Sequence, residues 1–243
     1  ASYPYLPWNS YAAWGQMLSF FVGSEAAISN HAHSGLTTES FRSEGHYRIL
    51  LDRVKKDDIV LFQFGHNDQK LMELKHDEGY HDRLLTYIRE IREIGATPVI
   101  VSPLARNSWK KDGDLTRYND LLKDYAKECE LVTEKLDACF IDLHQRSIDL
   151  ILTMGRDKAK SLFFPGDYTH TNDYGAFLFA SMIFDGLKKL GIVSAKRVDT
   201  LWQPLEETFD LVIPDEYKNR KNPDGAELFE NLERPEDFLT RVE

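Results

Sequence analysis

Short apolar segments alternate with amphipathic ones along most of this chain, and this alternation limits its fold more than any other feature. Segments with helical periodicity alternate regularly with continuous apolar runs. The runs predict buried strands at DIVLFQFG (58–65), TPVIVSP (97–103) and DACFIDL (137–143), with a shorter strand at EAAISN (25–30). Helices are predicted at 11–22, 46–54, 80–94, 114–135, near 145–154 and at 173–191. Such alternation indicates an α/β protein, a three-layer α/β/α sandwich around a parallel, flavodoxin-like sheet.

Polar stretches follow three of these predicted strands. HAHSG comes after 25–30, GHND after 58–64 and SPLARNS after 97–102. The carboxyl ends of parallel strands meet at one edge of a sheet, and ligands bind there in open α/β folds. The sequence therefore predicts a site at this edge.

Composition excludes some partners. The chain has 40 acidic and 30 basic residues among 243, a net charge of -10, which argues against a nucleic acid. It also weakly disfavours a polyanionic substrate such as pectin, although the field in a cleft is set locally. No window approaches a membrane-spanning apolar run. Cys129 and Cys139 form neither a metal pattern nor a disulfide framework, and we expect two buried thiols.

Four polar motifs occur in a defined order. They are WGQ (14–16), NHAHSGLTTESFRSEG (30–45), FQFGHND (62–68) and DYTHTNDYGA (167–176). Taken together, and in this order, they resemble the SGNH (GDSL-like) hydrolases, and within them the rhamnogalacturonan acetylesterase group. The resemblance covers roughly residues 11 to 192.

The resemblance implies a serine esterase that removes acetyl groups from plant cell-wall polysaccharide such as rhamnogalacturonan or pectin. His170 is then the general base and Asp167 holds its imidazole, while the Gly35 N–H and the Asn67 amide stabilise the oxyanion. An acetylated oligo- or polysaccharide is the implied partner. No cofactor is implied, because the acyl group travels on the protein, and we expect no metal.

The chain departs from the family pattern at the nucleophile. The family's serine lies in a Gly-Asp-Ser motif after the first strand, and the sequence contains no Gly-Asp-Ser. Counting back from Trp14 reaches Ser2 at the closest, without Gly-Asp before it. We therefore expect the serine and the first strand to lie outside this chain. That strand would be central, and without it backbone groups of 25–30 and 58–64 are left unpaired.

Other interpretations of these motifs stay open. Thr171, Asn172 or Asp173 suits a helix N-cap, and Asn67-Asp68 suits a turn. A zinc site could draw on a set of five side chains, His31, His33, His66, Asp167 and His170. A chain without a nucleophile could also be a non-catalytic carbohydrate-binding relic of an esterase.

Three further residues are weaker candidates for substrate contact. Arg106 follows a strand and could meet an acidic sugar, Trp109 could stack on a sugar face, and His33 could line the cleft. Each is equally typical of an ordinary surface loop.

The composition changes near residue 195, and two parts are expected. Residues 1–194 form the hydrolase-like domain, and 195–243 a charged, proline-bearing extension and linker. Residues 233–243 resemble the opening of an S-layer homology repeat, which implies cell-wall attachment through a following module and a secreted or cell-surface protein. The same residues are typical of a solvated linker.

Overall fold

The computed structural model describes residues 11–22, 26–112 and 115–193. Its main sheet holds three parallel strands, β1 (Ile59–Phe62), β2 (Thr97–Val101) and β5 (Cys139–Ile141), in the order β1-β2-β5. Leu61 pairs with Val99, and Val99 in turn pairs with Cys139, and these pairs define the register of the three strands. The predicted parallel α/β sheet is confirmed.

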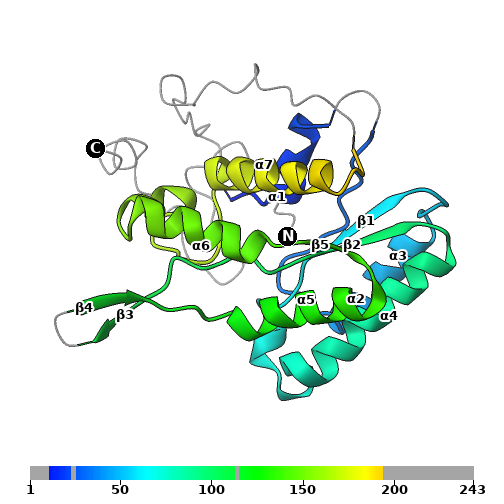
Figure 1. Cartoon of the computed structure of the whole chain (residues 1–243), viewed down its shortest axis with the longest axis horizontal. Helices are drawn as coiled ribbons and strands as arrows, with labels where there is room; N and C mark the ends of the chain where they lie inside the picture. Colours follow the sequence, from blue (N-terminus) through cyan, green and yellow to red (C-terminus); the bar gives the residue numbers. More distant parts are fainter. Residues whose placement is uncertain (1–10, 23–25, 113–114, 194–243) are drawn as a thin grey trace, which may run out of the picture.

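Helices cover both faces of this sheet. The helices are α1 (Trp14–Met17), α2 (Ser40–Ser43), α3 (His46–Leu51), α4 (His81–Glu93), α5 (Lys123–Leu136), α6 (Leu143–Met154) and α7 (Asp173–Lys189). Shorter helical turns occur at Leu18–Phe20, Asp68–Lys70, Met72–Leu74, His76–Tyr80 and Lys158–Leu162. In Figure 1, α1, α6 and α7 lie on one side of the sheet, while α2, α3, α4 and α5 lie on the other.

Alternating side chains of β2 divide the core into two clusters. Val99 and Val101 point to the cluster under α1, α6 and α7, whereas Ile100 points to the cluster under α3, α4 and α5. All three side chains are fully buried. Each face of β2 meets a helical layer, so side chains on both faces are buried. This explains why its sequence is a continuous apolar run. The three-layer architecture follows from this alternation.

Two predictions of secondary structure were wrong. Residues 26–30 form no strand and are exposed, because no strand lies beside them in the described part of the chain to supply a hydrogen-bonding ladder. The predicted helix 114–135 begins only at Lys123. Before it, β3 (Trp109–Asp112) and β4 (Leu115–Tyr118) form an antiparallel hairpin that projects from the body in Figure 1.

The remaining helices and strands have the predicted type, but their first and last residues differ from the predicted ones. Strand β1 stops at Phe62 and α3 at Leu51, both short of the predicted bounds. Cys129 is buried in α5, whereas Cys139 in β5 is only partly buried. Across the described segments, none of the helices has the length and apolar character needed to cross a bilayer. The predicted extension 195–243 lies outside the described residues.

Candidate active site

The turn before α7 brings Asp167 and His170 together. Phe163 and Thr171 form an isolated bridge, and the Phe164 N–H donates to the His170 carbonyl at 2.9 Å, so the chain doubles back. Within this loop, His170 Nδ1 lies 2.6 Å from Asp167 Oδ2. The same carboxylate accepts from the backbone N–H groups of Thr169 and His170, at 2.7 and 3.1 Å to Oδ1.

These contacts determine the charge of the Asp167 carboxylate. Burial by itself would raise the pKa of Asp167, but the hydrogen bonds from His170 and the two backbone N–H groups lower it below its usual value. Asp167 is therefore ionised near neutral pH. A carboxylate at Nδ1 holds the proton on that nitrogen, so Nε2 is the ring nitrogen that can take a proton from a reactant.

Aromatic packing supports the turn from the other end of the chain. Tyr11 stacks on Phe164 with ring centroids 3.7 Å apart and lies edge-on to His170 at 5.9 Å. Ala12 donates to the Thr171 carbonyl at 3.2 Å and accepts from the Thr171 hydroxyl at 2.5 Å. These contacts place the segment before α1 beside the imidazole, a role that the sequence did not indicate.

A second cluster joins the two predicted oxyanion donors. The Asn67 Nδ2 group donates to the Leu36 carbonyl at 3.2 Å, directly after Gly35. Gly35 has a φ of +84° and open space where a side chain would stand, so its backbone can be approached closely. The Asn67 amide nitrogen carries a second N–H, which is the kind of donor that an oxyanion needs.

Asp68 fixes the relative position of these two loops. Its fully buried carboxylate accepts from the Thr38 N–H at 2.8 Å, the Thr38 hydroxyl at 2.6 Å and the Gly65 N–H at 3.0 Å. The Gly35–Thr38 loop and the Gly65–Asn67 loop are therefore tied through one side chain. The sequence offered Asp68 only as a turn residue.

The loop after β2 lies between the two clusters. Arg106 Nη2 donates to the His66 carbonyl at 3.3 Å, and the Asn107 N–H donates to the Tyr168 carbonyl at 2.9 Å. Burial, the positive charge of Arg106 and a smaller effect of His170 lower the pKa of His66 to about 3. His66 is therefore neutral at physiological pH and sits within electrostatic reach of His170. The contacts connect the Asp167–His170 turn to the GHND loop through the loop that follows β2.

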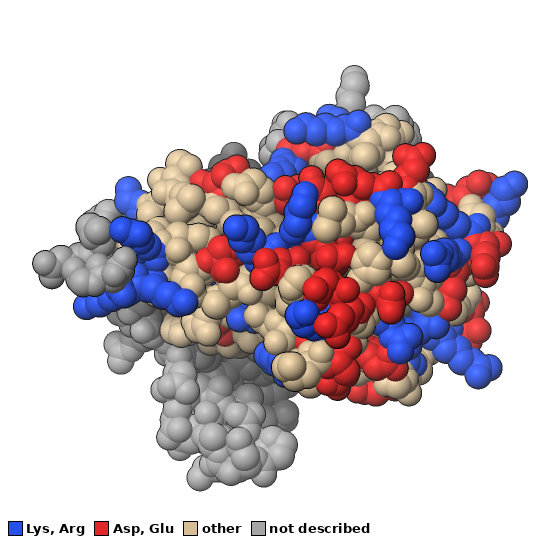
Figure 2. All heavy atoms as spheres, turned by 60° about the horizontal axis from the view of Figure 1, so that its bottom comes forward, with Lys and Arg blue, Asp and Glu red and all other residues tan. Residues whose placement is uncertain are grey.

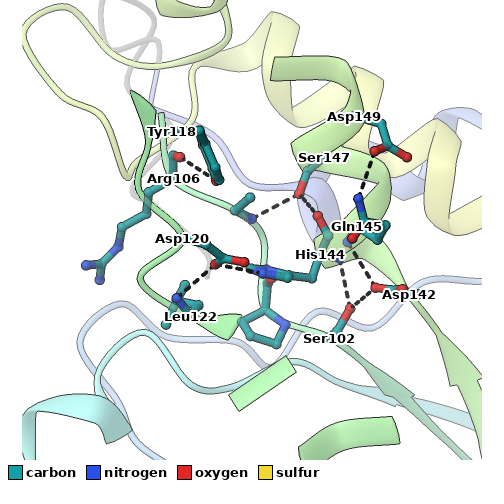
Figure 3. A network of polar contacts seen from close by, with 12 residues as sticks. Ser102, Arg106, Tyr118, Asp120, Leu122, Asp142, His144, Gln145, Ser147 and Asp149 are labelled. Atoms are coloured by element: carbon teal, nitrogen blue, oxygen red, sulfur yellow. Dashed lines mark hydrogen bonds and ion pairs between the residues drawn. The ribbon is translucent and has the colours of Figure 1, made fainter. Parts of the chain in front are cut away.

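A polar network with buried members at Ser102, His144 and Ser147 anchors this loop on α6 (Figure 3). Ser102 Oγ accepts from the His144 N–H at 2.8 Å and donates to Asp142 at 3.0 Å. The His144 ring contacts the Pro103 carbonyl at 2.9 Å and Asp120 at 3.0 Å. The Arg106 side chain points away from this network in Figure 3. The network therefore holds the backbone of the loop and leaves the guanidinium outside it.

Two weaker candidates have mainly structural contacts. Trp109 is partly buried at the base of the hairpin, donates from Nε1 to Asn107 at 2.7 Å and lies edge-on to Tyr118. His33 is exposed, with its ring centroid 4.0 Å from that of His46. Neither contact favours a sugar over ordinary packing. Among the described residues there is no group of three or more His, Cys, Asp or Glu side chains that could hold a metal.

Comparison with known proteins identifies the family of this chain. The profile of the GDSL-like lipase/acylhydrolase family matches residues 2–176. The chain is 29% identical over 194 residues to the rhamnogalacturonan acetylesterase RhgT of Bacillus subtilis, covering 74% of this chain and 82% of that protein. It is 30% identical over 187 residues to the probable rhamnogalacturonan acetylesterase YesY of the same organism, covering 74% and 84%.

A solved structure supports the fold. The crystal structure of protein YXIM of Bacillus subtilis superposes with a TM-score of 0.67 at 24% identity, covering 77% of this chain and 52% of that one. The chain therefore belongs to the GDSL-like lipase/acylhydrolase family, the SGNH hydrolases, and its similarity is to the rhamnogalacturonan acetylesterase group within that family.

Proposed function

We propose that this protein is a serine esterase that removes O-acetyl groups from plant cell-wall polysaccharide, rhamnogalacturonan or a related pectic polymer. The observation that carries the proposal is the 2.6 Å contact between His170 Nδ1 and Asp167 Oδ2, on a turn that is hydrogen-bonded to the loop after β2, which in turn contacts the His66 carbonyl beside Asn67. The names of the relatives support the choice of substrate.

The steps follow from these positions. His170 Nε2 takes the proton of an attacking serine hydroxyl, and the oxygen forms a bond to the acetyl carbonyl carbon. The Gly35 N–H and the Asn67 amide stabilise the resulting oxyanion. His170 then returns the proton to the sugar hydroxyl as it leaves. Water deacylates the serine by the same route in reverse, with Asp167 stabilising the imidazolium in both halves.

This sequence contains no Gly-Asp-Ser motif, so the nucleophilic serine is not found in its usual context. Strand β1 pairs only with β2 in the described part of the sheet, and the 26–30 segment runs exposed without a strand partner. We propose that a strand ending in Gly-Asp-Ser pairs with the open edge of β1 and places its hydroxyl beside His170.

One experiment tests both halves of this proposal. The chain is extended at its N-terminus with a Gly-Asp-Ser-bearing strand, and acetate release from acetylated rhamnogalacturonan is measured. We expect turnover in the extended protein, a loss of about a thousandfold or more in its His170→Ala variant, and unchanged thermal stability of that variant. His76→Ala, a histidine on a different turn, is the matched control.

The outcomes separate the alternatives. Turnover that survives His170→Ala contradicts the assignment of the base. Oligosaccharide binding with no acetate release from the extended protein favours the non-catalytic carbohydrate-binding relic.

A further inference from the structure

The Lys70 side chain stands over one of the two proposed oxyanion donors. Residues Asp68–Lys70 form a short 3₁₀ turn, in which the Lys70 N–H donates to the Asn67 carbonyl at 3.0 Å. Residues three apart eclipse each other in such a turn, so the side chains of Lys70 and Asn67 come together. Lys70 Nζ donates to Asn67 Oδ1 at 2.7 Å. The ammonium therefore holds the oxygen end of the amide.

The two ends of the Asn67 amide have different partners. Oδ1 accepts from the Lys70 ammonium, while Nδ2 donates one N–H to the Leu36 carbonyl at 3.2 Å. A rotation of the amide by half a turn would place its NH₂ group against the ammonium and its oxygen against the Leu36 carbonyl. Donor would then face donor, and acceptor would face acceptor. The two partners therefore select one orientation of the amide, which fixes the direction of the second Nδ2 hydrogen.

The turn that carries this pair is anchored on both sides. The fully buried Asp68 carboxylate accepts from the N–H groups of Thr38 and Gly65. The Gln69 N–H donates to the Gly65 carbonyl at 3.2 Å, and its Nε2 donates to the His66 carbonyl at 3.1 Å. The backbone of the turn is therefore well fixed, although the lysine at its end is exposed.

The partner of this ammonium differs from the usual partner of a surface lysine in this protein. Figure 2 shows acidic and basic side chains close together over much of one face, and the chain has 40 carboxylates and 30 cations. Lys75, for example, pairs with Asp77 at 2.9 Å and Glu78 at 3.1 Å. Lys70 forms no salt bridge within the described part of the chain and donates to a neutral amide. Surface charge pairing therefore does not explain its position.

A cation at the carbonyl oxygen also makes the amide a stronger donor. Hydrogen bonds in a chain polarise one another. The ammonium draws electron density from the amide nitrogen through the planar O=C–N group, so the Nδ2 hydrogens become more positive. An oxyanion is stabilised by donors that are already aimed at it before the charge develops. Lys70 can thus act on an oxyanion through Asn67, without touching the substrate.

We propose that Lys70 is a positioning residue of the oxyanion hole: its ammonium selects the orientation of the Asn67 amide and strengthens the N–H that the oxyanion receives. This inference rests on the proposed function, which supplies the oxyanion. It adds a residue that the polar motifs of the sequence did not single out. The orientation of the amide needs no serine, so it can be measured in the chain alone.

The first measurement follows the Asn67 side-chain amide by ¹H–¹⁵N NMR in residues 1–243. Lys70→Met keeps most of the apolar stem and removes the ammonium. We expect the Nδ2 nitrogen signal of Asn67 to move upfield, because the carbonyl oxygen loses a charged donor. Lys70→Arg, which restores a cationic donor, should move the signal back. An Asn67 signal that stays in place in Lys70→Met overturns the proposal.

The second measurement is kinetic and uses the protein extended with the Gly-Asp-Ser-bearing strand. We expect Lys70→Met to lower kcat for acetate release about tenfold and to leave KM and the melting temperature unchanged, since the contact acts in the transition state. Asn67→Ala should lower kcat about a hundredfold or more. Adding Lys70→Met to Asn67→Ala should then change kcat by less than about twofold, because the lysine acts through the amide.

The double variant separates this role from direct charge attraction. A further loss of about tenfold in the Asn67→Ala background would mean that the lysine acts on the substrate itself, and would overturn the proposal. Lys75→Met is the matched control, since it removes an exposed ammonium whose partners are Asp77 and Glu78. It should leave the Asn67 signal and kcat as in the wild type. Equal effects of Lys70→Met and Lys75→Met would also overturn the proposal.

The proposal and the proposed function can fail separately. An extended protein that releases no acetate contradicts the esterase, while the Asn67 signal still shows whether Lys70 fixes the amide. Acetate release with the wild-type kcat in Lys70→Met overturns the positioning role and leaves the esterase intact.

Discussion

At the scale of single residues, the candidate site combines two histidines with opposite surroundings. The Nδ1 atom of His170 lies 2.6 Å from the ionised carboxylate of Asp167, which orients the ring. His66 is desolvated by burial and lies beside Arg106, where a positive charge is disfavoured. The first environment suits a general base, whereas the second suits a neutral ring that lines the site. The pattern of the sequence could not distinguish them, because burial and neighbouring charge are set by the fold.

The low pKa of His66 predicts a pH-dependent stability. A histidine whose pKa falls from 6.5 to about 3 on folding binds more protons in the unfolded state between these values. Its contribution to the free energy of unfolding is present above pH 6.5 and is lost as the pH falls towards 3. We expect His66→Asn to have a smaller drop in stability across this window in denaturant titrations. A slope equal to that of the wild type would contradict the assignment.

At the scale of elements, α7 is positioned by one asparagine and one glycine. Asn172 caps the helix by accepting from the Gly175 N–H at 2.8 Å, and its Nδ2 donates to the Ser161 and Phe163 carbonyls. A Cβ on Gly175 would lie 2.0 Å from the Leu162 carbonyl oxygen, so only glycine fits there. The structural interpretation of DYTHTNDYGA is confirmed, since Asn172 is the N-cap of α7 and fastens the turn to the helix, while the catalytic interpretation belongs to the proposed function.

Substitution of Asn172 separates its two tasks. Asn172→Asp keeps the oxygen that caps the helix and loses both N–H donors, while Asn172→Ala loses all three contacts. We expect Asn172→Ala to lower the free energy of unfolding by about 2–4 kcal/mol, with Asn172→Asp between it and the wild type. Chemical denaturation measures both. Equal stability of the alanine variant and the wild type would contradict the role of this cap.

The hairpin is the element that sequence periodicity misplaced. The stretch WKKDGDLTRY contains Asp112-Gly113, a strong turn signal between two short strands, but Leu115 and Arg117, which lie within the predicted helix 114–135, are also good helix formers. The tertiary contacts of Trp109 and Tyr118 favour the hairpin over a helix, because they partly bury both rings at its base.

At the scale of the whole molecule, the described part of the main sheet has two outer strands, β1 and β5. Strand β1 pairs with β2 on one side, and on its other side it meets no described strand. An unpaired edge exposes N–H and C=O groups that a further strand could satisfy. The helical layers on both faces are nevertheless complete enough to bury β2 fully.

This edge predicts a pattern of amide exchange. The β1 amides that point away from β2 should exchange with solvent much faster than those of β2, and should become protected when the Gly-Asp-Ser-bearing strand is supplied. Hydrogen exchange followed by NMR resolves the alternating amides. Uniform protection along β1 in the chain alone would mean that another part of the protein already covers the edge.

The sequence by itself determined the fold class, the family and the catalytic pair as candidates. Apolar periodicity reports which faces are buried, and Asp167 and His170 lie on one short turn whose geometry is local. Tertiary structure decided what depends on distant neighbours: the failure of 26–30 to form a strand, the Asp68 tie between the loops of Gly35 and Asn67, and the neutral state of His66. Strand pairing, buried hydrogen bonds and desolvation each require a partner far away in the chain, and a linear pattern does not specify that partner.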